Sequence, residues 1–169
     1  MPEIVLDTCV LSNFALAGAM GAIEKLYGGQ ALVPDFVAVE IIRGIQSGNA
    51  GLEAVPEAIK AGWLKEAFLR SREERELFEV LTRSMGLGEA AGIALAAKRG
   101  WRFASDDRQA RAEAGRLGIC LSGTLGILIK AVRMGACDLG AADSYLAKMI
   151  EAGFYSPVRT VSKVLTGIL

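Results

Sequence analysis

The stretch IVLDTCVLSNF, residues 4–14, decides the fold class because it joins two apolar runs through a single carboxylate. The run before Asp7 has the length and composition of a buried strand, whereas the run after it has those of a helix. A charge buried without a partner is strongly unfavourable. The position of Asp7 therefore needs an explanation from the rest of the chain.

The remainder of the 169-residue chain repeats this alternation of short strand-like runs and longer helical ones, without an internal repeat or linker. Strands are predicted at 3–6, 31–33, 62–67, 101–105 and 118–122, with helices between them. This order predicts an α/β fold, a three-layer α/β/α sandwich around a short, mostly parallel sheet of four to five strands. We expect a single domain over residues 1–169, with a C-terminal helical extension from about residue 138. The last helix is expected to be entered through Ser156 and Pro157.

The composition excludes several classes of function. The chain has 19 Lys plus Arg, 19 Asp plus Glu and no His. The net charge therefore does not demand a nucleic-acid partner, and the missing His excludes Ser–His and Cys–His catalysis and most zinc sites. Cys9, Cys120 and Cys137 are odd in number and lack CxxC spacing, which argues against a disulfide framework.

Hydropathy gives no sign of a membrane protein. Hydrophobic residues make up 52% of the chain and the mean hydropathy is +0.36. No run reaches the roughly 18 uncharged apolar residues of a spanning helix, and the first residues lack the basic start of a signal peptide. We therefore expect a cytoplasmic protein without a membrane partner.

Acidic residues follow the predicted strands at the places where a parallel sheet binds its ligands, the carboxyl ends of the strands. Asp7 follows the first strand, and Asp106 and Asp107 follow the strand at 101–105. Glu40 falls on the inward stripe of the helix that begins near residue 34, and Glu89 opens the helix at 88–100. We therefore treat these acids as candidates for one site.

Each of these acids also has a purely structural explanation. An aspartate after a strand can cap the next helix and contribute about 1 kcal/mol. A glutamate in a first helical turn is favoured by the helix dipole. The capping explanation stays open for Asp7, Asp106 and Asp107, the first-turn explanation for Glu89, and a surface position for Glu40.

Taken together, the acids indicate a metal site. Several carboxylates in a partly buried cleft raise one another's pKa and cannot all stay charged. A hard divalent cation removes this conflict, and a set of oxygen ligands suits Mg²⁺ or Mn²⁺. Such an ion activates a water and neutralises charge on a phosphate, as phosphodiester hydrolysis requires.

Four motifs around these acids resemble the PIN domain family of metal-dependent nucleases. IVLDTCVLSNF resembles the first acidic motif of the family, VPDFVAVEI the second, GEAAGIALA the third and FASDDRQAR the fourth. The progression is most similar to prokaryotic PIN proteins related to VapC-type toxins. The resemblance extends from about Glu3 to Leu128.

The resemblance implies roles for the acids. It implies that Asp7, Glu40 and Glu89 are catalytic carboxylates and that Asp106 or Asp107 supplies the last one, with the metal held by Asp7, Glu40 and this Asp106/Asp107 pair. The family pattern slightly favours Asp107, although Asp106 is nearer the strand end. Glu89 departs from the aspartate of many PIN proteins, and its longer side chain suits a water-mediated role.

Further residues resemble supporting parts of PIN sites. Thr8 and Ser105 resemble the hydroxyl residues that hold the carboxylates in place. Arg108 and Arg111 follow the fourth motif, where guanidinium groups can hold RNA phosphates. The two arginines are equally compatible with an ordinary solvated helix face.

These expectations combine into a function. The resemblance implies a Mg²⁺- or Mn²⁺-dependent endoribonuclease, the toxin of a type II toxin–antitoxin pair, acting on RNA as a homodimer with an antitoxin protein as partner. The apolar tail from Val158 to Leu169 suits either a partner surface or core packing. One alternative is a PIN-like scaffold that binds RNA or a protein without cutting. A phosphatase of the haloacid dehalogenase type is disfavoured, because Cys9 stands where that family needs a second aspartate.

Overall fold

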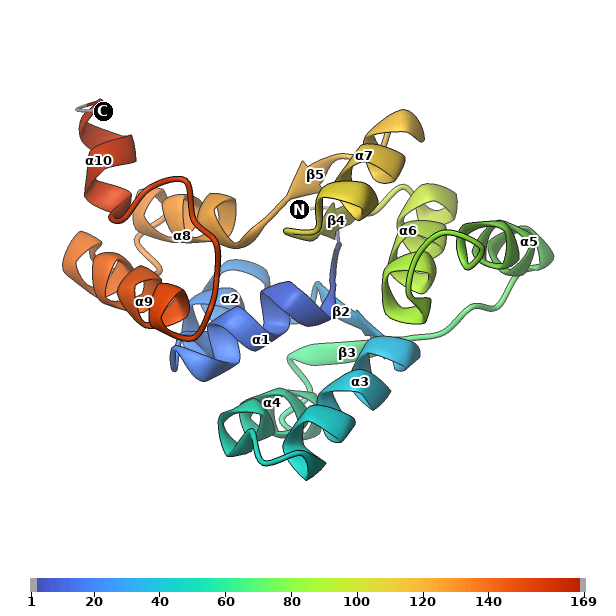
Figure 1. Ribbon diagram of the computed structural model, residues 1–169, viewed down its shortest axis with the longest axis horizontal. Coiled ribbons are helices and arrows are strands. Elements are labelled where there is room, and N and C mark those ends of the chain that lie inside the picture. Colours follow the sequence, from blue (N-terminus) through green and yellow to red (C-terminus); the bar gives the residue numbers. More distant parts are fainter. Residues whose placement is uncertain (1–2, 168–169) are drawn as a thin grey trace.

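The computed structural model describes residues 3–167, which form one five-stranded parallel sheet between helical layers (Figure 1). The strand order is β3-β2-β1-β4-β5, so β1 occupies the centre. The strands are β1 (Ile4–Leu6), β2 (Ala31–Pro34), β3 (Leu64–Ala67), β4 (Arg102–Ala104) and β5 (Leu121–Ser122). The predicted α/β/α sandwich is confirmed, and the sheet has five strands that all pair in parallel.

Helices connect the strands, as parallel pairing requires. They are α1 (Thr8–Leu16), α2 (Met20–Tyr27), α3 (Asp35–Gln46), the 3₁₀ turn η1 (Ala50–Glu53), α4 (Ala54–Lys60), α5 (Arg72–Leu81), α6 (Leu87–Arg99), α7 (Arg108–Arg116), α8 (Thr124–Arg133), α9 (Leu139–Glu151) and α10 (Val161–Thr166). In Figure 1, α5 and α6 lie on the opposite side of the sheet from α8 and α9.

The sheet separates two hydrophobic cores because successive strand side chains point to opposite faces. Ile4 and Leu6 belong to the core formed with α1, α2, α8 and α9. Val5, between them, belongs to the core formed with α5, α6 and α7. Phe103 of β4 lies in the second core against Gly92 of α6, where an added Cβ would come within 2.6 Å of the ring. A glycine is therefore needed for α6 to approach the sheet.

The register of the two central strands sets up the candidate site. Leu6 at the end of β1 pairs with Ala104 at the end of β4. The next residues, Asp7 and Ser105, therefore leave the same edge of the sheet from neighbouring strands. The backbone N–H of Asp7 donates to the carbonyl of Ala104 at 3.1 Å.

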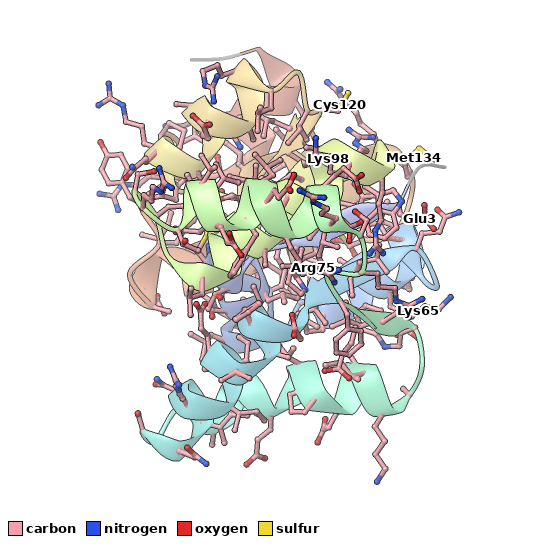
Figure 2. All side chains as sticks on the ribbon, turned by 90° about the vertical axis from the view of Figure 1, so that its right-hand side faces the viewer. Glu3, Lys65, Arg75, Lys98, Cys120 and Met134 are labelled. Carbon is pink, nitrogen blue, oxygen red and sulfur yellow. The ribbon has the colours of Figure 1, made fainter. Side chains whose placement is uncertain are left out.

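In Figure 2, where the α5 and α6 side of the molecule faces the viewer, residues at or near the starts of three strands are labelled. Cys120 before β5, Glu3 before β1 and Lys65 of β3 lie one below another on one side of this view, in the order of the strands. Cys120 is exposed, whereas Cys9 and Cys137 are half-buried, and all three are free thiols.

The last helix begins later than predicted. It starts at Val161, and Ser156 belongs to a local turn in which its hydroxyl donates to the carbonyl of Val158 at 2.6 Å. The Asp143 carboxylate of α9 accepts from the N–H groups of Val161 and Ser162 at 2.6 and 3.1 Å and so caps α10. The hydroxyl of Thr160, the N-cap residue, also accepts from the N–H of Lys163 at 3.4 Å, so a local and a long-range cap together set the start of the helix.

The described part of the apolar tail packs on the fold. Val161 is buried, and Val164 and Leu165 are half-buried where α10 meets α8 and α9. Ile168 and Leu169 lie outside the described residues. Within residues 3–167 no single helix is long and apolar enough to cross a membrane. Helices α1 and α2 reach that length only together, and the chain bends by 119° between them.

Candidate active site

Asp7 caps α1 and is buried at the same time. Its Oδ1 atom accepts from the N–H of Val10 at 3.0 Å, so the capping explanation holds. The residue is nevertheless only 2% exposed, and no Lys or Arg within residues 3–167 forms an ion pair with it. A helix cap is ordinarily solvated, so capping alone does not account for this burial.

Burial raises the pKa of Asp7 to about 6. Hydrogen bonds from Cys9, Ser105 and Val10 act in the opposite direction, and the negative charge of Asp106 raises the pKa further. The Asp7 carboxylate thus shares its surroundings with a second carboxylate, and no Lys or Arg of the described residues pairs with it.

The thiol of Cys9 links the two carboxyl-bearing segments. Its sulfur donates to Asp7 Oδ1 at 2.9 Å and accepts from the N–H of Asp106 at 3.3 Å. Burial, followed by the charge of Asp7, raises the pKa of this thiol, so Cys9 stays protonated and acts as a donor. Cys9 therefore holds the end of β1 and the end of β4 together.

The two adjacent aspartates after β4 have different surroundings. Asp106 turns toward α8, where its Oδ1 accepts from the N–H of Thr124 at 2.9 Å and its Oδ2 from the Thr124 hydroxyl at 2.5 Å. Asp107 is exposed and caps α7 by accepting from the N–H of Ala110 at 2.8 Å. The geometry thus favours Asp106 over Asp107 as the carboxylate near Asp7, the reverse of the slight preference from the sequence.

Glu40 reaches the same region through Thr8. The hydroxyl of Thr8, the first residue of α1, donates to Glu40 Oε2. Glu40 also lies against Gly88 of α6, where an added Cβ would come within 2.9 Å of Oε2 and 3.0 Å of Oε1. The absence of a side chain at Gly88 therefore leaves space for this carboxylate.

Glu89 lies next to this contact but bonds within its own helix. Its Oε2 accepts from the N–H of Gly86 at 3.0 Å, an arrangement that closes the first turn of α6. The side chain is half-buried. The structural explanation for Glu89 is therefore realised, and its carboxylate forms no hydrogen bond with Asp7, Glu40 or Asp106 within the described chain.

The remaining predicted residues support the backbone or face solvent. Ser105 is fully buried, and its hydroxyl accepts from the N–H of Asp107 at 3.1 Å. Arg111 uses Nη1 to donate to the carbonyls of Ser105, at 2.7 Å, and Ser122. Arg108 is exposed at the start of α7. Arg111 thereby ties the ends of β4 and β5 together.

Two residues that sequence reasoning missed complete the setting of Asp106. Asn13 of α1 donates through Nδ2 to Asp106 Oδ2 at 3.2 Å and to the Thr124 hydroxyl at 3.0 Å. Thr124 is a fully buried polar residue. A lone asparagine within the apolar run of α1 was the available signal. Gly123, next to Thr124, packs directly against this carboxylate, since an added Cβ would lie 2.8 Å from Asp106 Oδ1.

Asp35 is a further strand-end acid that the sequence rule could have found. It follows β2 directly, as Asp7 follows β1. Its Oδ1 atom is buried and has no hydrogen-bond partner within the described residues. Asp35 therefore adds an uncompensated oxygen at the carboxyl end of the sheet.

The donor chemistry of this edge fits a hard divalent cation. Within residues 3–167 no three acidic or thiol side chains are close enough together to hold an ion by themselves. Mg²⁺, however, is commonly held by one or two carboxylates together with the phosphate oxygens of a substrate. Asp7 and Asp106 provide two carboxylates within electrostatic reach of each other. The site thus suits a metal that binds together with a phosphate.

Comparison with known families gives the site its context. The model of the DUF3368 family, which is described as a PIN domain, matches residues 3–168. The chain belongs to the PIN domain family. No curated protein and no solved structure matched the chain. PIN domains are generally nucleases and typically use divalent metal ions, so membership of this family indicates a nuclease-type function.

Proposed function

We propose that this PIN protein is a Mg²⁺- or Mn²⁺-dependent endoribonuclease whose metal is held by Asp7 and Asp106, with Glu40 close by. The observation that carries the proposal is the placement of Asp7 and Asp106 at the ends of adjacent strands, joined through Cys9. The buried Asp7 carboxylate has no ion-pair partner among the described side chains, and a cation would offset the cost of its charge.

The protein's own groups would position the reacting centre. Thr124 and Asn13 fix the orientation of Asp106 through three hydrogen bonds to its carboxylate. Cys9 and the N–H of Val10 fix Asp7 Oδ1. When bound, the ion supplies a nucleophilic water and neutralises charge on the scissile phosphate. Glu40, held by Thr8, adds negative charge beside this pair.

The neighbouring aspartates provide a matched test. The substitutions Asp106→Asn and Asp107→Asn remove one charge each at adjacent positions. Asn at 107 still caps α7, whereas Asn at 106 keeps only one of the two accepting oxygens, so thermal melting of both variants accompanies the assay. With a mixed single-stranded RNA pool and Mg²⁺ or Mn²⁺, we expect wild type and Asp107→Asn to cleave alike and Asp106→Asn to lose cleavage. Equal losses in both variants, or cleavage that survives Asp106→Asn, would refute the assignment of Asp106.

A non-cutting PIN-like scaffold is the second candidate, and one observation favours it. Glu89 closes its own helical turn and does not join the other acids. A scaffold would bind RNA or a partner protein in EDTA and would leave an intact RNA pool in either metal. Cleavage that depends on Mg²⁺ or Mn²⁺ and on Asp7 would exclude it.

We also propose a biological setting, which rests on the resemblance to VapC-type proteins alone. In that setting the protein is a cytoplasmic toxin, acts as a homodimer and is inhibited by an antitoxin. Mass measurement in solution tests the dimer. Co-expression with the product of a short adjacent reading frame tests the antitoxin, since a true antitoxin forms a complex and abolishes cleavage.

A further inference from the structure

A groove of about 700 Å³ lies beside the edge strand β5 and is not explained by the acidic site. Its walls are β5, α8 and the segment at residues 154–157 between α9 and α10. Asp106 lines one part of it, so the groove opens onto the candidate active site. The volume falls within the range of about 300–1,000 Å³ that is usual for ligand sites.

The groove extends along the strands. Arg102, the first residue of β4, lines it at the amino end of the sheet, and Asp106 lines it at the carboxyl end. Four residues of extended chain cover roughly 13 Å at about 3.3 Å per residue. Met134, another lining residue, lies in Figure 2 toward the same side as Glu3 and Cys120, where strands begin. The groove thus suits an extended ligand that spans from the active site to the far edge of the sheet.

The charges along this groove favour a polyanion. Arg102, Arg111, Lys130 and Arg133 line it, against Asp106 as the acid within the described lining. The Nε atom of Arg102 is buried and has no hydrogen-bond partner in the described chain. Arg133 is exposed in the last turn of α8. These positions are spread over the length of the groove, which matches a chain of phosphates better than a single anion.

Aromatic side chains accompany the cations. Tyr155 is 92% exposed on the groove wall, and Phe154 beside it is half-buried. At the other wall, the Lys130 ammonium lies 4.3 Å from the centre of the Tyr27 ring and donates to its hydroxyl at 3.2 Å. Tyr27 is buried, so Tyr155 is the ring that is exposed for stacking. Proteins that bind single-stranded nucleic acids combine a basic groove with aromatic rings on which bases stack.

We infer that this groove binds the single-stranded RNA segment adjoining the scissile phosphate, with a base stacked on Tyr155 and backbone phosphates near Arg133 and Arg102. The inference rests on the proposed ribonuclease function for the identity of the ligand. An acidic peptide would pair with the cations, but its Asp and Glu side chains carry no ring that could stack on the exposed Tyr155. The RNA therefore accounts for both features of the groove.

The test measures binding apart from cleavage. Fluorescence anisotropy of a short labelled single-stranded RNA is recorded in EDTA for wild type, Tyr155→Ala and Tyr155→Phe. We expect about 10-fold weaker binding for Tyr155→Ala, since stacking on an aromatic ring is lost, and unchanged binding for Tyr155→Phe. Equal affinity of Tyr155→Ala and wild type, or no binding by wild type, would overturn the inference. Thermal melting checks that each variant is folded.

A second pair of variants tests the phosphate contact. Arg133→Ala and Lys148→Ala each remove one cation from the last turn of a helix, on α8 and α9 respectively. Arg133→Ala should weaken RNA binding several-fold and reduce the salt dependence of log K by about 0.7. Lys148→Ala should match wild type. Equal effects of the two variants would show general charge attraction and would contradict a phosphate contact at Arg133.

Two further outcomes separate the groove from the catalytic proposal. RNA that binds through Tyr155 but is not cut in Mg²⁺ or Mn²⁺ would support the groove and refute the nuclease. Cleavage by wild type that Tyr155→Ala and Arg133→Ala leave unchanged, with unchanged RNA affinity, would refute the groove alone. A poly-glutamate peptide that displaces the RNA and depends equally on Tyr155 would overturn the assignment to nucleic acid.

Discussion

Two acids in this molecule, Asp7 and Glu74, are buried almost equally, at 2% and 4% exposure, yet they are in opposite electrostatic situations. Glu74 of α5 accepts from Arg99 Nε at 2.6 Å and from the N–H of Ser71 at 3.1 Å. The hydrogen bonds and charge of Arg99 lower its pKa to about 2. Burial raises the pKa of Asp7 to about 6.

The difference distinguishes a structural acid from a candidate functional one. Arg99 compensates Glu74 within the protein, and the same arginine donates to the carbonyl of Phe68 at 2.7 Å and lies 4.7 Å from the centre of the Trp101 ring. Asp7 accepts hydrogen bonds but forms no ion pair with any residue from 3 to 167. Burial alone thus says little about function, whereas burial without charge compensation indicates a ligand.

The largest expected effect separates activity from stability at Asp7. Asp7→Asn keeps an acceptor for Val10 but removes the charge, so metal-dependent cleavage should fall on the order of 1,000-fold. The same change should raise the free energy of unfolding at pH 8 by roughly 1–3 kcal/mol, because about two pKa units of unfavourable ionisation disappear. Cleavage assays and urea unfolding in EDTA measure the two quantities. If Asp7→Asn were both inactive and destabilised, Asp7 would be a structural acid like Glu74.

Glu74→Gln should lose stability and keep its cleavage activity, the reverse of Asp7→Asn. It leaves the Arg99 charge without its partner and should lower the free energy of unfolding by about 3 kcal/mol, as the lowered pKa of Glu74 implies. Cleavage per folded molecule should stay unchanged. Chemical denaturation and a titration of active protein provide the measurements, and loss of activity in well-folded Glu74→Gln would show that α5 contributes to the site.

The pH dependence of stability should have opposite signs at the two acids. The lowered pKa of Glu74 gives stability that is complete above about pH 4.5 and is lost as the pH falls toward 2. Asp7 binds a proton in the folded state but not in the unfolded state between about pH 4 and 6, so stability falls as the pH rises through this window. Melting temperatures are measured against pH in EDTA. Glu74→Gln should lose the decrease toward pH 2, and Asp7→Asn should lose the decrease between about pH 4 and 6. If Asp7→Asn kept the decrease between about pH 4 and 6, that decrease would belong to another group.

Added Mg²⁺ should provide the positive charge that Arg99 provides for Glu74 and that Asp7 does not receive from the described residues. At pH 8 and tenfold excess over its dissociation constant, a bound ion stabilises the folded state by about 1.4 kcal/mol. The rise in melting temperature should be present in Glu74→Gln and absent in Asp7→Asn. Calorimetric titration with Mg²⁺ in the presence of a short non-cleavable RNA analogue gives an independent readout, and equal heats for Asp7→Asn and wild type would place the ion elsewhere.

The smallest expected effect tests the space around Glu40. Gly88→Ala introduces a Cβ 2.9 Å from both Glu40 Oε2 and a methyl of Val37, which should cost about 1 kcal/mol and reduce cleavage. Gly21 of α2 has no atom within 4 Å of an added Cβ, so Gly21→Ala should stabilise the protein by about 0.5 kcal/mol. Unfolding of both variants under one set of conditions provides the comparison. Unchanged cleavage in Gly88→Ala would separate Glu40 from the reaction.

The fold could be predicted because its signals are local. Apolar runs such as Ile4–Leu6 alternate with longer helical runs, and short runs of this kind are buried only in a sheet covered on both faces. The start of α10 had a local signal in Thr160, which caps the helix by accepting from the N–H of Lys163, but its second cap, Asp143, lies eighteen residues before Val161. A contact of this kind depends on the packing of two helices and leaves no local signal.

The candidate site was predictable only in part. The rule of acids after strands selects Asp7 and the Asp106/Asp107 pair as candidates, but the choice within the pair depends on backbone direction beyond β4. The capping role of Glu89 had a readable signal, its spacing of three from Gly86. Thr124 had no such signal. Its hydroxyl is buried because it donates to Asp106, and this partner lies eighteen residues away in the sequence.

Helix α1 concentrates most of this site in nine residues, since it begins under the Asp7 cap and carries Thr8, Cys9 and Asn13. Fraying of its first turn would therefore disturb the orientation of every carboxylate these residues hold. The amide protons of Val10 and Leu11, bonded to Asp7 Oδ1 and to the Asp7 carbonyl, should exchange with deuterium at a rate that reports the integrity of the acidic centre. Slow exchange would mean that the centre is preorganised before any substrate arrives.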